Sequence, residues 1–328
     1  IAEKAGVSQA TVSRVLNQDQ NLSVSDATRK LIFETAEKLH YQKKDRKNNP
    51  LQSKRYRIAI LEWVTEEEEL EDLYYYSIRV GIEKQAQELG HDIFRVFNLE
   101  DWGPLEKADG IIALGKFSPE TIRQLESYQK RLVFVDSNTL VYGHTCVMTD
   151  FETSVYQALA YLIESGHNQI GLLVGQETTA DNRPLQTDPR YMSFKHYLEE
   201  KELYQSDYIR VGHFSSDSGY DMMKDLIDEL GNRLPSAFFM ASDALAVGAL
   251  RALQEASIPV PDRVSLISFN DTSIAKHVYP PLSTVTVYTE EMGKQAIHSL
   301  LQDLQRGDSG IPTMHTLATR LTIRESTR

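Results

Sequence analysis

The first residues that could do chemistry lie in the stretch AGVSQATVSRVLN, residues 5–17. It joins a Gly-containing turn to a short helix-forming run rich in Ser, Thr, Gln and Arg. An Arg can bind guanine through two hydrogen bonds, a Gln can pair with adenine, and an Ala offers only a methyl contact. Short hydroxyl and amide side chains suit phosphate oxygens, which set register without carrying sequence information. The stretch therefore predicts a DNA-contacting helix, with an ordinary solvated helix face as the alternative.

Charge is distributed unevenly along the chain. The 328 residues carry a formal net charge of −12, yet residues 1–57 alone sum to +6 and the remainder to −18. Such an asymmetry indicates a nucleic-acid module joined to an acidic body. Phosphate contacts would make its docking salt-sensitive. A merely basic tail is the alternative, but a tail would not carry the helical pattern described next.

Composition excludes several classes of protein. No apolar run approaches the 18 residues of a membrane span, and the first residues lack the apolar core of a secretory signal. The single cysteine, Cys146, rules out an intramolecular disulfide and a Cys-based zinc cluster. No nucleophile–base pair, metal triad or phosphate-cradling Gly loop stands out. We therefore expect a cytoplasmic protein that is not an enzyme and has no cofactor, no metal and no membrane partner.

Two capped helices follow the opening turn. Ser8 can accept the first free amides of a helix over residues 9–16, on which Val12 and Val15 form a buried stripe. Ser25 can cap a second helix that begins TRKLIFETAEK. This pattern predicts a helix-turn-helix head over residues 1–41. The chain begins without Met, inside a predicted helix, so we expect the head to be incomplete at its N-terminus.

The rest of the chain is a linker and an α/β body. Residues 42–56 are polar, basic and interrupted by Pro50, which is typical of a linker. From residue 57 on, β-rich apolar runs such as RIAILEW, RLVFVDS, QIGLLVG and VSLISFND alternate with helical patterns. This alternation predicts parallel sheets covered by helices, in two successive subdomains. Ligands of such sheets bind beyond the carboxyl ends of the strands.

The whole chain resembles the lactose/galactose repressor family of bacterial transcription regulators. The resemblance is carried by the head motif AGVS-x-x-TVSRVLN, by GH-x-x-I, by ASD-x-x-A-x-GALRAL, and by IPVPDRVSLISFND with YPPLSTV. The last run looks most like the galactose and evolved β-galactosidase repressor branch. The resemblance implies two Rossmann-like parallel-sheet subdomains, similar to periplasmic binding proteins, that close over a sugar. It also implies that the chain crosses between the subdomains three times. The N-subdomain would comprise residues 57–161 plus about 289–318, and the C-subdomain residues 162–288 plus about 319–328.

The resemblance also assigns roles in the head. Gln9, Ala10 and Arg14 stand where the family reads bases, and the set expected to contact DNA comprises Ser8, Gln9, Ala10, Thr11, Ser13, Arg14, Asn17 and Leu51. Leu51 lies near the position of a leucine that wedges the minor groove, but Pro50 would break a helix entering it. A plain disordered linker is the alternative there.

In the body, the resemblance points to seven residues around a sugar effector: Tyr74, Tyr75, Arg190, Phe214, Ser242, Asp243 and Asn270. A guanidinium fork at Arg190 pairs naturally with adjacent sugar hydroxyls, the alternative being a surface Arg at a helix start. Core packing is the alternative for Tyr74, Tyr75 and Phe214. Asp243 could instead cap the next helix. Asn270 can both accept from and donate to a hydroxyl.

These expectations combine into a homodimeric repressor of a galactose or lactose utilisation operon. It would read a pseudo-palindromic operator in double-stranded DNA and leave it when a galactoside binds. A leucine heptad for tetramers is absent from the LATRLTIRESTR ending. Two alternatives remain open at this point. One is a regulator whose small molecule promotes DNA binding, and the other is a sugar-binding transport protein.

Overall fold

The computed structural model describes residues 2–16, 24–38, 54–65, 69, 73–97, 101–181, 183–184, 187–307 and 310–328. The chain separates into two compact units, residues 1–53 and residues 54–328. Among the described residues, none of the helices is long and apolar enough to cross a membrane.

The first unit is a small helical head. It contains α1 (Ala2–Ala5), α2 (Gln9–Leu16) and α3 (Asp26–Lys38). Gly6 joins the first two helices with φ +64°, a left-handed conformation that glycine adopts without a steric penalty. Ala5, Val12, Val15 and Ile32 pack into one apolar core. The head therefore has the helix-turn-helix arrangement that the sequence predicts.

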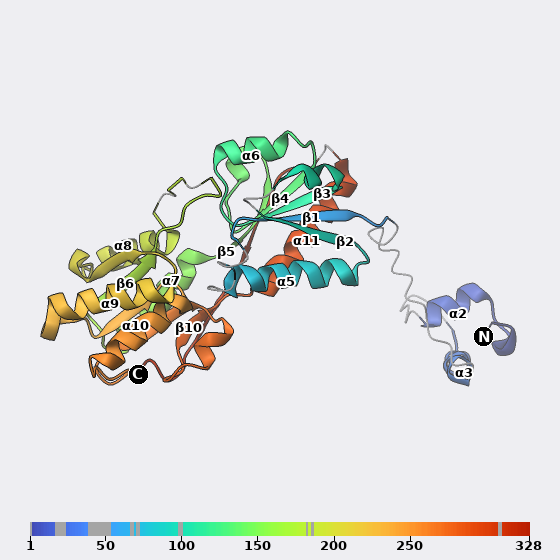
Figure 1. Cartoon of the computed structure of the whole chain (residues 1–328). Helices are drawn as coiled ribbons and strands as arrows, with labels where there is room; N and C mark the ends of the chain where they lie inside the picture. Colours follow the sequence, from blue (N-terminus) through green and yellow to red (C-terminus); the bar gives the residue numbers. More distant parts are fainter. Residues whose placement is uncertain are drawn as a thin grey trace. The chain divides into compact units, whose positions relative to one another are not determined.

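The second unit contains two six-stranded sheets (Figure 1). The first sheet has the order β11-β5-β4-β3-β1-β2, and all its pairings are parallel. Its strands are β1 (Arg57–Glu62), β2 (Asp92–Phe97), β3 (Gly110–Leu114), β4 (Arg131–Val135), β5 (Thr145–Thr149) and β11 (Met314–Leu317). Strands such as β3 are buried along their whole length, as expected for a parallel sheet covered on both faces.

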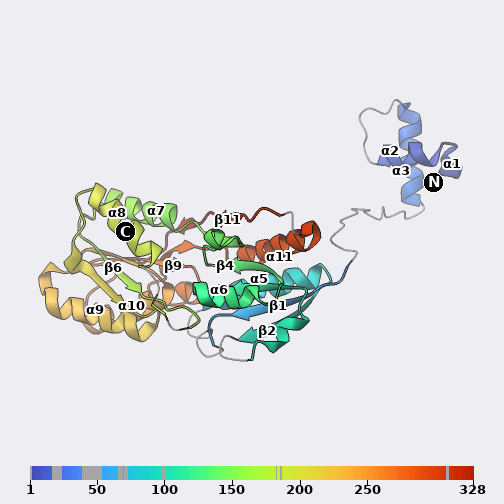
Figure 2. The same ribbon diagram turned by 90° about the horizontal axis from the view of Figure 1, so that it is seen from above.

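The second sheet has the order β12-β10-β9-β8-β6-β7, and only the β10–β12 pair is antiparallel. Its strands are β6 (Ile170–Gly175), β7 (Ile209–Gly212), β8 (Ala237–Met240), β9 (Ser265–Asn270), β10 (Ser283–Thr286) and β12 (Arg320–Thr322). The two sheets and their helices form the two lobes seen in Figures 1 and 2. The α/β fold class predicted from the alternating pattern is confirmed.

Helices cover both sheets. Those of the first subdomain are α5 (Leu73–Glu88), α6 (Pro119–Glu126) and α11 (Thr289–Arg306). Those of the second are α7 (Phe151–Glu164), α8 (Pro189–Glu200), α9 (Ser216–Leu230) and α10 (Asp243–Glu255). Short 3₁₀ helices lie in the connections: η2 (Gly103–Lys107), η3 (Leu140–Tyr142), η4 (Ser206–Tyr208), η5 (Gly231–Arg233) and η6 (Ser273–Lys276).

The chain passes between the two sheets three times. The sequence places the first passage near residue 161, but the structure places it near Asp150, because α7 packs against α8, β8 and β12 of the second subdomain. The second passage lies between β10 and α11, which packs on α5 and on β3, β4 and β5. The third lies between β11 and β12, which belong to different sheets. Each subdomain is thus assembled from separate stretches of the chain.

Candidate DNA-binding and effector sites

Helix α2 presents the residues expected to contact DNA on one exposed face. Gln9, Ser13 and Arg14 are exposed, whereas Val12 and Val15 are buried on the opposite side. The Ala10 side chain, Asn17 and Leu51 lie outside the described residues. The helix therefore offers amide, hydroxyl and guanidinium groups together, which is the chemistry that base edges and phosphates require.

The start of this helix is fixed by hydroxyl groups. Ser8 Oγ accepts a hydrogen bond from the Thr11 amide at 3.1 Å, so Ser8 is the N-cap that the sequence predicts. The same oxygen lies 2.8 Å from Thr11 Oγ1. Ser25 caps α3 in the same way, accepting from the Thr28 amide at 3.2 Å. Ser8 therefore stabilises the start of the helix that carries Gln9 and Arg14.

In the body, Arg190 lies at the start of α8, where Asp188 is the N-cap. Its Nε donates to Asp188 Oδ1 at 2.8 Å, its Nη2 to Asp188 Oδ2 at 2.6 Å, and its Nη1 to the Ala241 carbonyl at 2.7 Å. Only 8% of the residue is exposed, so the alternative of a surface Arg is wrong. Burial alone would raise the pKa of Asp188, but the charge and hydrogen bonds of Arg190 outweigh it and hold that pKa below its usual range.

Three phenylalanine rings surround the Arg190 guanidinium. Its central carbon lies 4.6 Å from the Phe214 ring centroid, 5.3 Å from that of Phe151 and 5.5 Å from that of Phe269. Such cation–π contacts hold the guanidinium plane in place. A guanidinium has five N–H donors, of which three are used by Asp188 and Ala241, so among the described residues one donor on each terminal nitrogen is left for a ligand.

A second cluster, built around Asp136, faces the same region from the first subdomain. Asp136 follows β4 with φ +65° and accepts from Tyr74 Oη at 3.3 Å and Tyr75 Oη at 2.8 Å. Lys116, which follows β3, donates to Asp136 Oδ2 at 2.8 Å. Tyr74 and Tyr75 are buried, as core residues would be, but their hydroxyls belong to this polar cluster. We call Lys116, Asp136, Tyr74, Tyr75, Glu177 and Arg190 the effector cluster.

Glu177 joins the effector cluster from the second subdomain. Its Oε2 lies 3.9 Å from Lys116 Nζ, so an ion pair joins the loop after β3 to the loop after β6. Burial raises the pKa of Glu177 to about 7, although Lys116 and Arg190 act against the rise. Burial would lower the pKa of Lys116, but Asp136 and Glu177 raise it. Burial and the Asp136 charge raise the pKa of both tyrosines, which therefore stay protonated donors.

The remaining predicted effector residues differ in their surroundings. Phe214 stacks on Arg190, and Asn270 ends β9 with φ +106°, a strained conformation of the kind found at functional sites. Ser242 caps α10 by accepting from the Leu245 amide, so the capping role considered for Asp243 is wrong. The Asp243 carboxylate is buried and accepts from Ser268, the Thr272 amide and hydroxyl, and Thr284. These bonds tie α10 to β9 and β10.

Five residues of this region were not singled out from the sequence: Lys116, Asp136, Phe151, Glu177 and Phe269. The first four lie within two residues of a strand's carboxyl end, and Phe269 lies inside β9. The rule that ligands bind beyond strand ends would have selected those four. It could not have selected Phe269, whose ring stacks on that of Phe151 at 5.8 Å between centroids.

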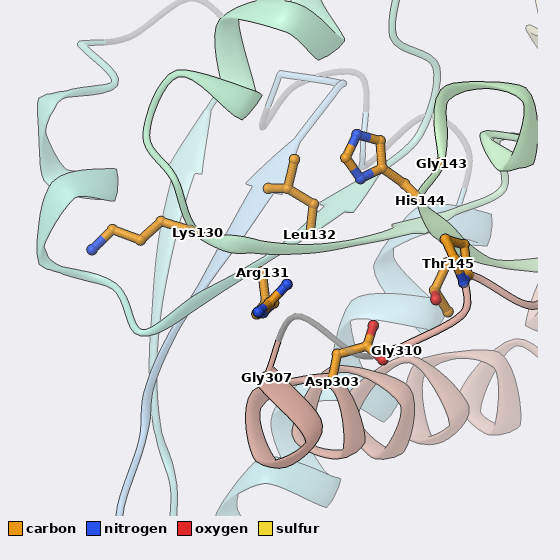
Figure 3. A pocket seen from close by; sticks show the side chains of 10 residues that line it. Lys130, Arg131, Leu132, Gly143, His144, Thr145, Asp303, Gly307 and Gly310 are labelled. Carbon is orange, nitrogen blue, oxygen red and sulfur yellow. The ribbon is translucent and has the colours of Figure 1, made fainter.

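Away from the effector cluster, a pocket of about 180 Å³ lies at the amino ends of β4 and β5, next to the end of α11 (Figure 3). Lys130, Arg131, His144, Thr145 and Asp303 line it, and it contains no residue of the effector cluster. His144 Nε2 lies 2.8 Å from Glu126 Oε1. Within the described part of the chain, no group of His, Cys, Asp and Glu residues could hold a metal ion.

The chain is similar to known regulators over its whole length. Residues 1–44 match the family described as bacterial regulatory proteins, lacI family, and residues 159–327 match the periplasmic binding protein-like domain. The HTH-type transcriptional regulator GalR of Streptococcus thermophilus is 51% identical, covering 100% of this chain and 98% of that protein. GalR of Lacticaseibacillus casei is 40% identical, with coverages of 99% and 98%. A solved complex of the transcriptional regulator CelR with cellobiose has TM-score 0.74 at 25% identity, covering 99% and 98%.

Proposed function

Because this chain belongs to the LacI family of bacterial regulatory proteins, we propose that it represses genes for galactoside use and is released from its operator by a galactoside. The observation that carries the proposal is the cradle of Arg190, a buried guanidinium with unused donors beyond the strand ends of the second sheet. The relatives named GalR, 51% and 40% identical, support galactose as the sugar.

The DNA side of the proposal rests on α2. Its exposed face would enter the major groove, where Arg14 and Gln9 read base edges while Thr11 and Ser13 contact phosphates. The family resemblance implies a homodimer. A homodimer of such heads reads a pseudo-palindrome whose half-sites lie about one helical turn apart.

The effector side rests on complementary chemistry. A sugar presents adjacent hydroxyls and apolar C–H patches on its ring. The two remaining Arg190 donors can bind adjacent hydroxyls, Asp136 and Asn270 can accept from others, and the Phe214 ring offers a face for the C–H patch. Because the guanidinium is already buried, sugar binding removes little further water from it. The sugar hydroxyls replace the water that it does lose.

The switch would be a hinge motion of the two subdomains. The Lys116–Glu177 pair is one of the contacts that exist only while the subdomains lie together. A sugar bound between Arg190 and Asp136 would favour this closed arrangement, because it contacts both sides. Closure would then rotate the first subdomains of the dimer and separate the heads, which lowers operator affinity.

The decisive experiment measures operator binding with and without galactose, lactose and a purine base. Release by galactose or lactose supports the proposal. Tighter DNA binding with any of the three would instead show a corepressor, the opposite sign of regulation. A sugar-binding transport protein would bind the sugar but no DNA, and the match of residues 1–44 argues against it.

A further inference from the structure

A second pocket, of about 410 Å³, lies between the two subdomains and outside the effector cluster. Its walls include Asp101, Trp102, Thr121, Gln124 and Tyr128 of the first subdomain and Asp181 of the second. We propose that this pocket is a separate binding site for a neutral saccharide. Its volume falls within the ordinary range for small-molecule sites.

The wall supplied by the second subdomain is held in place by a clasp, which we define as residues 178–181 with Arg183. The Ala180 amide donates to the Lys116 carbonyl at 2.9 Å, and Ser118 Oγ donates to Asp181 Oδ2 at 2.9 Å. Arg183 Nη1 donates to Glu120 Oε2 at 2.6 Å. Ala180 itself packs into the apolar core of the first subdomain. The pocket is therefore complete only while the subdomains lie together.

The lining selects the chemistry of the ligand. Two aromatic residues, Trp102 and Tyr128, line the pocket, and two carboxylates, Asp101 and Asp181, can accept from hydroxyls. The carboxylates disfavour an anion. Thr121, Gln124 and Tyr128 also place neutral donors and acceptors along the walls, and the Asp181 charge is already paired with Arg183, whose Nε lies 2.9 Å from Asp181 Oδ2. The hydroxyls of a neutral ligand therefore suit the pocket better than an ammonium ion.

Lys116 connects this pocket to the effector cluster. Its carbonyl accepts from Ala180 of the clasp, while its ammonium group pairs with Asp136 and Glu177. A ligand in either place stabilises the closed arrangement, so the two should bind with positive coupling. This coupling rests on the proposed sugar-responsive function, whereas saccharide binding to the pocket does not.

The two tryptophans of the chain allow the two places to be observed separately. Trp63 lies beside the effector cluster, with its ring centroid 5.3 Å from that of Tyr75, and Trp102 lies in the pocket. In the Trp63→Phe variant, titration with galactose and with lactose should give a saturable change in Trp102 fluorescence. Adding Asp101→Asn should weaken that affinity about tenfold, because a charge-assisted hydrogen bond is lost. Adding Glu106→Gln, which neutralises a nearby exposed carboxylate outside the pocket, should leave it unchanged.

A third variant tests whether the Trp102 response depends on sugar binding at the effector cluster. Combining Trp63→Phe with Arg190→Met and Asp188→Asn should leave a saturable Trp102 response, with its affinity lowered only by the lost coupling to the effector cluster. Loss of the response in this background would overturn the proposal, since Trp102 would then report only a transmitted change. No saturable response to either sugar, or a response to tetramethylammonium chloride in their place, would also overturn it. The Trp102→Phe variant tests the proposed function separately, because its fluorescence comes from Trp63 beside the effector cluster. No change in that fluorescence on adding galactose or lactose would count against the proposed function and not against the pocket.

Discussion

Replacing Arg190 by Met tests whether the buried guanidinium is a sugar ligand. The substitution keeps an unbranched apolar stem beside Phe214 and removes every donor. The lost charge-assisted hydrogen bonds to the sugar are worth about 1.5–3 kcal/mol, or about 10- to 150-fold in affinity. Operator binding without sugar should survive, because the residues expected to contact DNA lie in the head. The result would be a repressor that no longer responds to inducer.

The same substitution also costs stability. It removes both guanidinium hydrogen bonds to the Asp188 carboxylate, which keeps, among the described residues, only the backbone amide of residue 190 as a donor, and it leaves that group, only 5% exposed, without its counter-charge. Breaking a buried pair in this way costs about 3–5 kcal/mol. Asp188→Asn in the same chain removes the unpaired charge and keeps an N-cap of equal quality for α8. The double variant should therefore regain stability without regaining sugar affinity.

Calorimetric titration with galactose and lactose, beside urea unfolding and operator binding in the same buffer, measures all three quantities. If the folded double variant binds galactoside as the wild-type chain does, Arg190 serves only to anchor Asp188 and Ala241. The reasoning that places the ligand there would then be refuted.

Three further predictions concern the head, the linker and Glu177. Arg14→Ala should weaken operator binding by about 1–3 kcal/mol and random DNA far less, as measured by fluorescence anisotropy; equal losses would exclude base reading. Replacing Lys43, Lys44 and Lys47 by Ala should weaken both DNAs together and flatten the salt dependence by about 0.9 in log–log slope per lost phosphate contact. Burial raises the pKa of Glu177 from 4.5 to about 7, so the folded chain holds a proton that the unfolded chain releases, and stability should fall as pH rises through this window. Glu177→Gln should flatten that fall, worth roughly 1–3 kcal/mol, in urea midpoints measured from about pH 5 to about pH 8; an unchanged slope would show that Glu177 is not the group responsible.

Local chemistry was readable from the sequence. Ser8 and Ser25 cap helices as the sequence predicts, and Val12 and Val15 face the core of the head. The alternation of apolar strands and amphipathic helices gave the two α/β subdomains. These features depend on residues a few positions apart, for which propensity and periodicity are informative.

Long-range partners were not readable. Asp136 lies about sixty residues from Tyr74 and Tyr75 in the chain, and only the packing of α5 beside the end of β4 brings them together. Asp243 stands at a helix start, where capping is the local expectation, yet its bonds reach β9 and β10. Helix α7 was placed with the strand before it because nothing in its own sequence shows which sheet covers its apolar face.

The interleaved order of the strands has a consequence for how the chain folds. Strands β11 and β12 are separated by two residues, yet each is the edge strand of a different sheet, and β11 pairs with the distant β5 whereas β12 pairs with β10. Neither subdomain can complete its sheet until this short segment has docked on both. Contacts so distant in sequence slow folding, and they join the two lobes into one cooperative unit. Residues 54–328 should therefore unfold in a single transition, and a nascent chain that has not yet released residues 314–322 should expose one unpaired edge on each sheet.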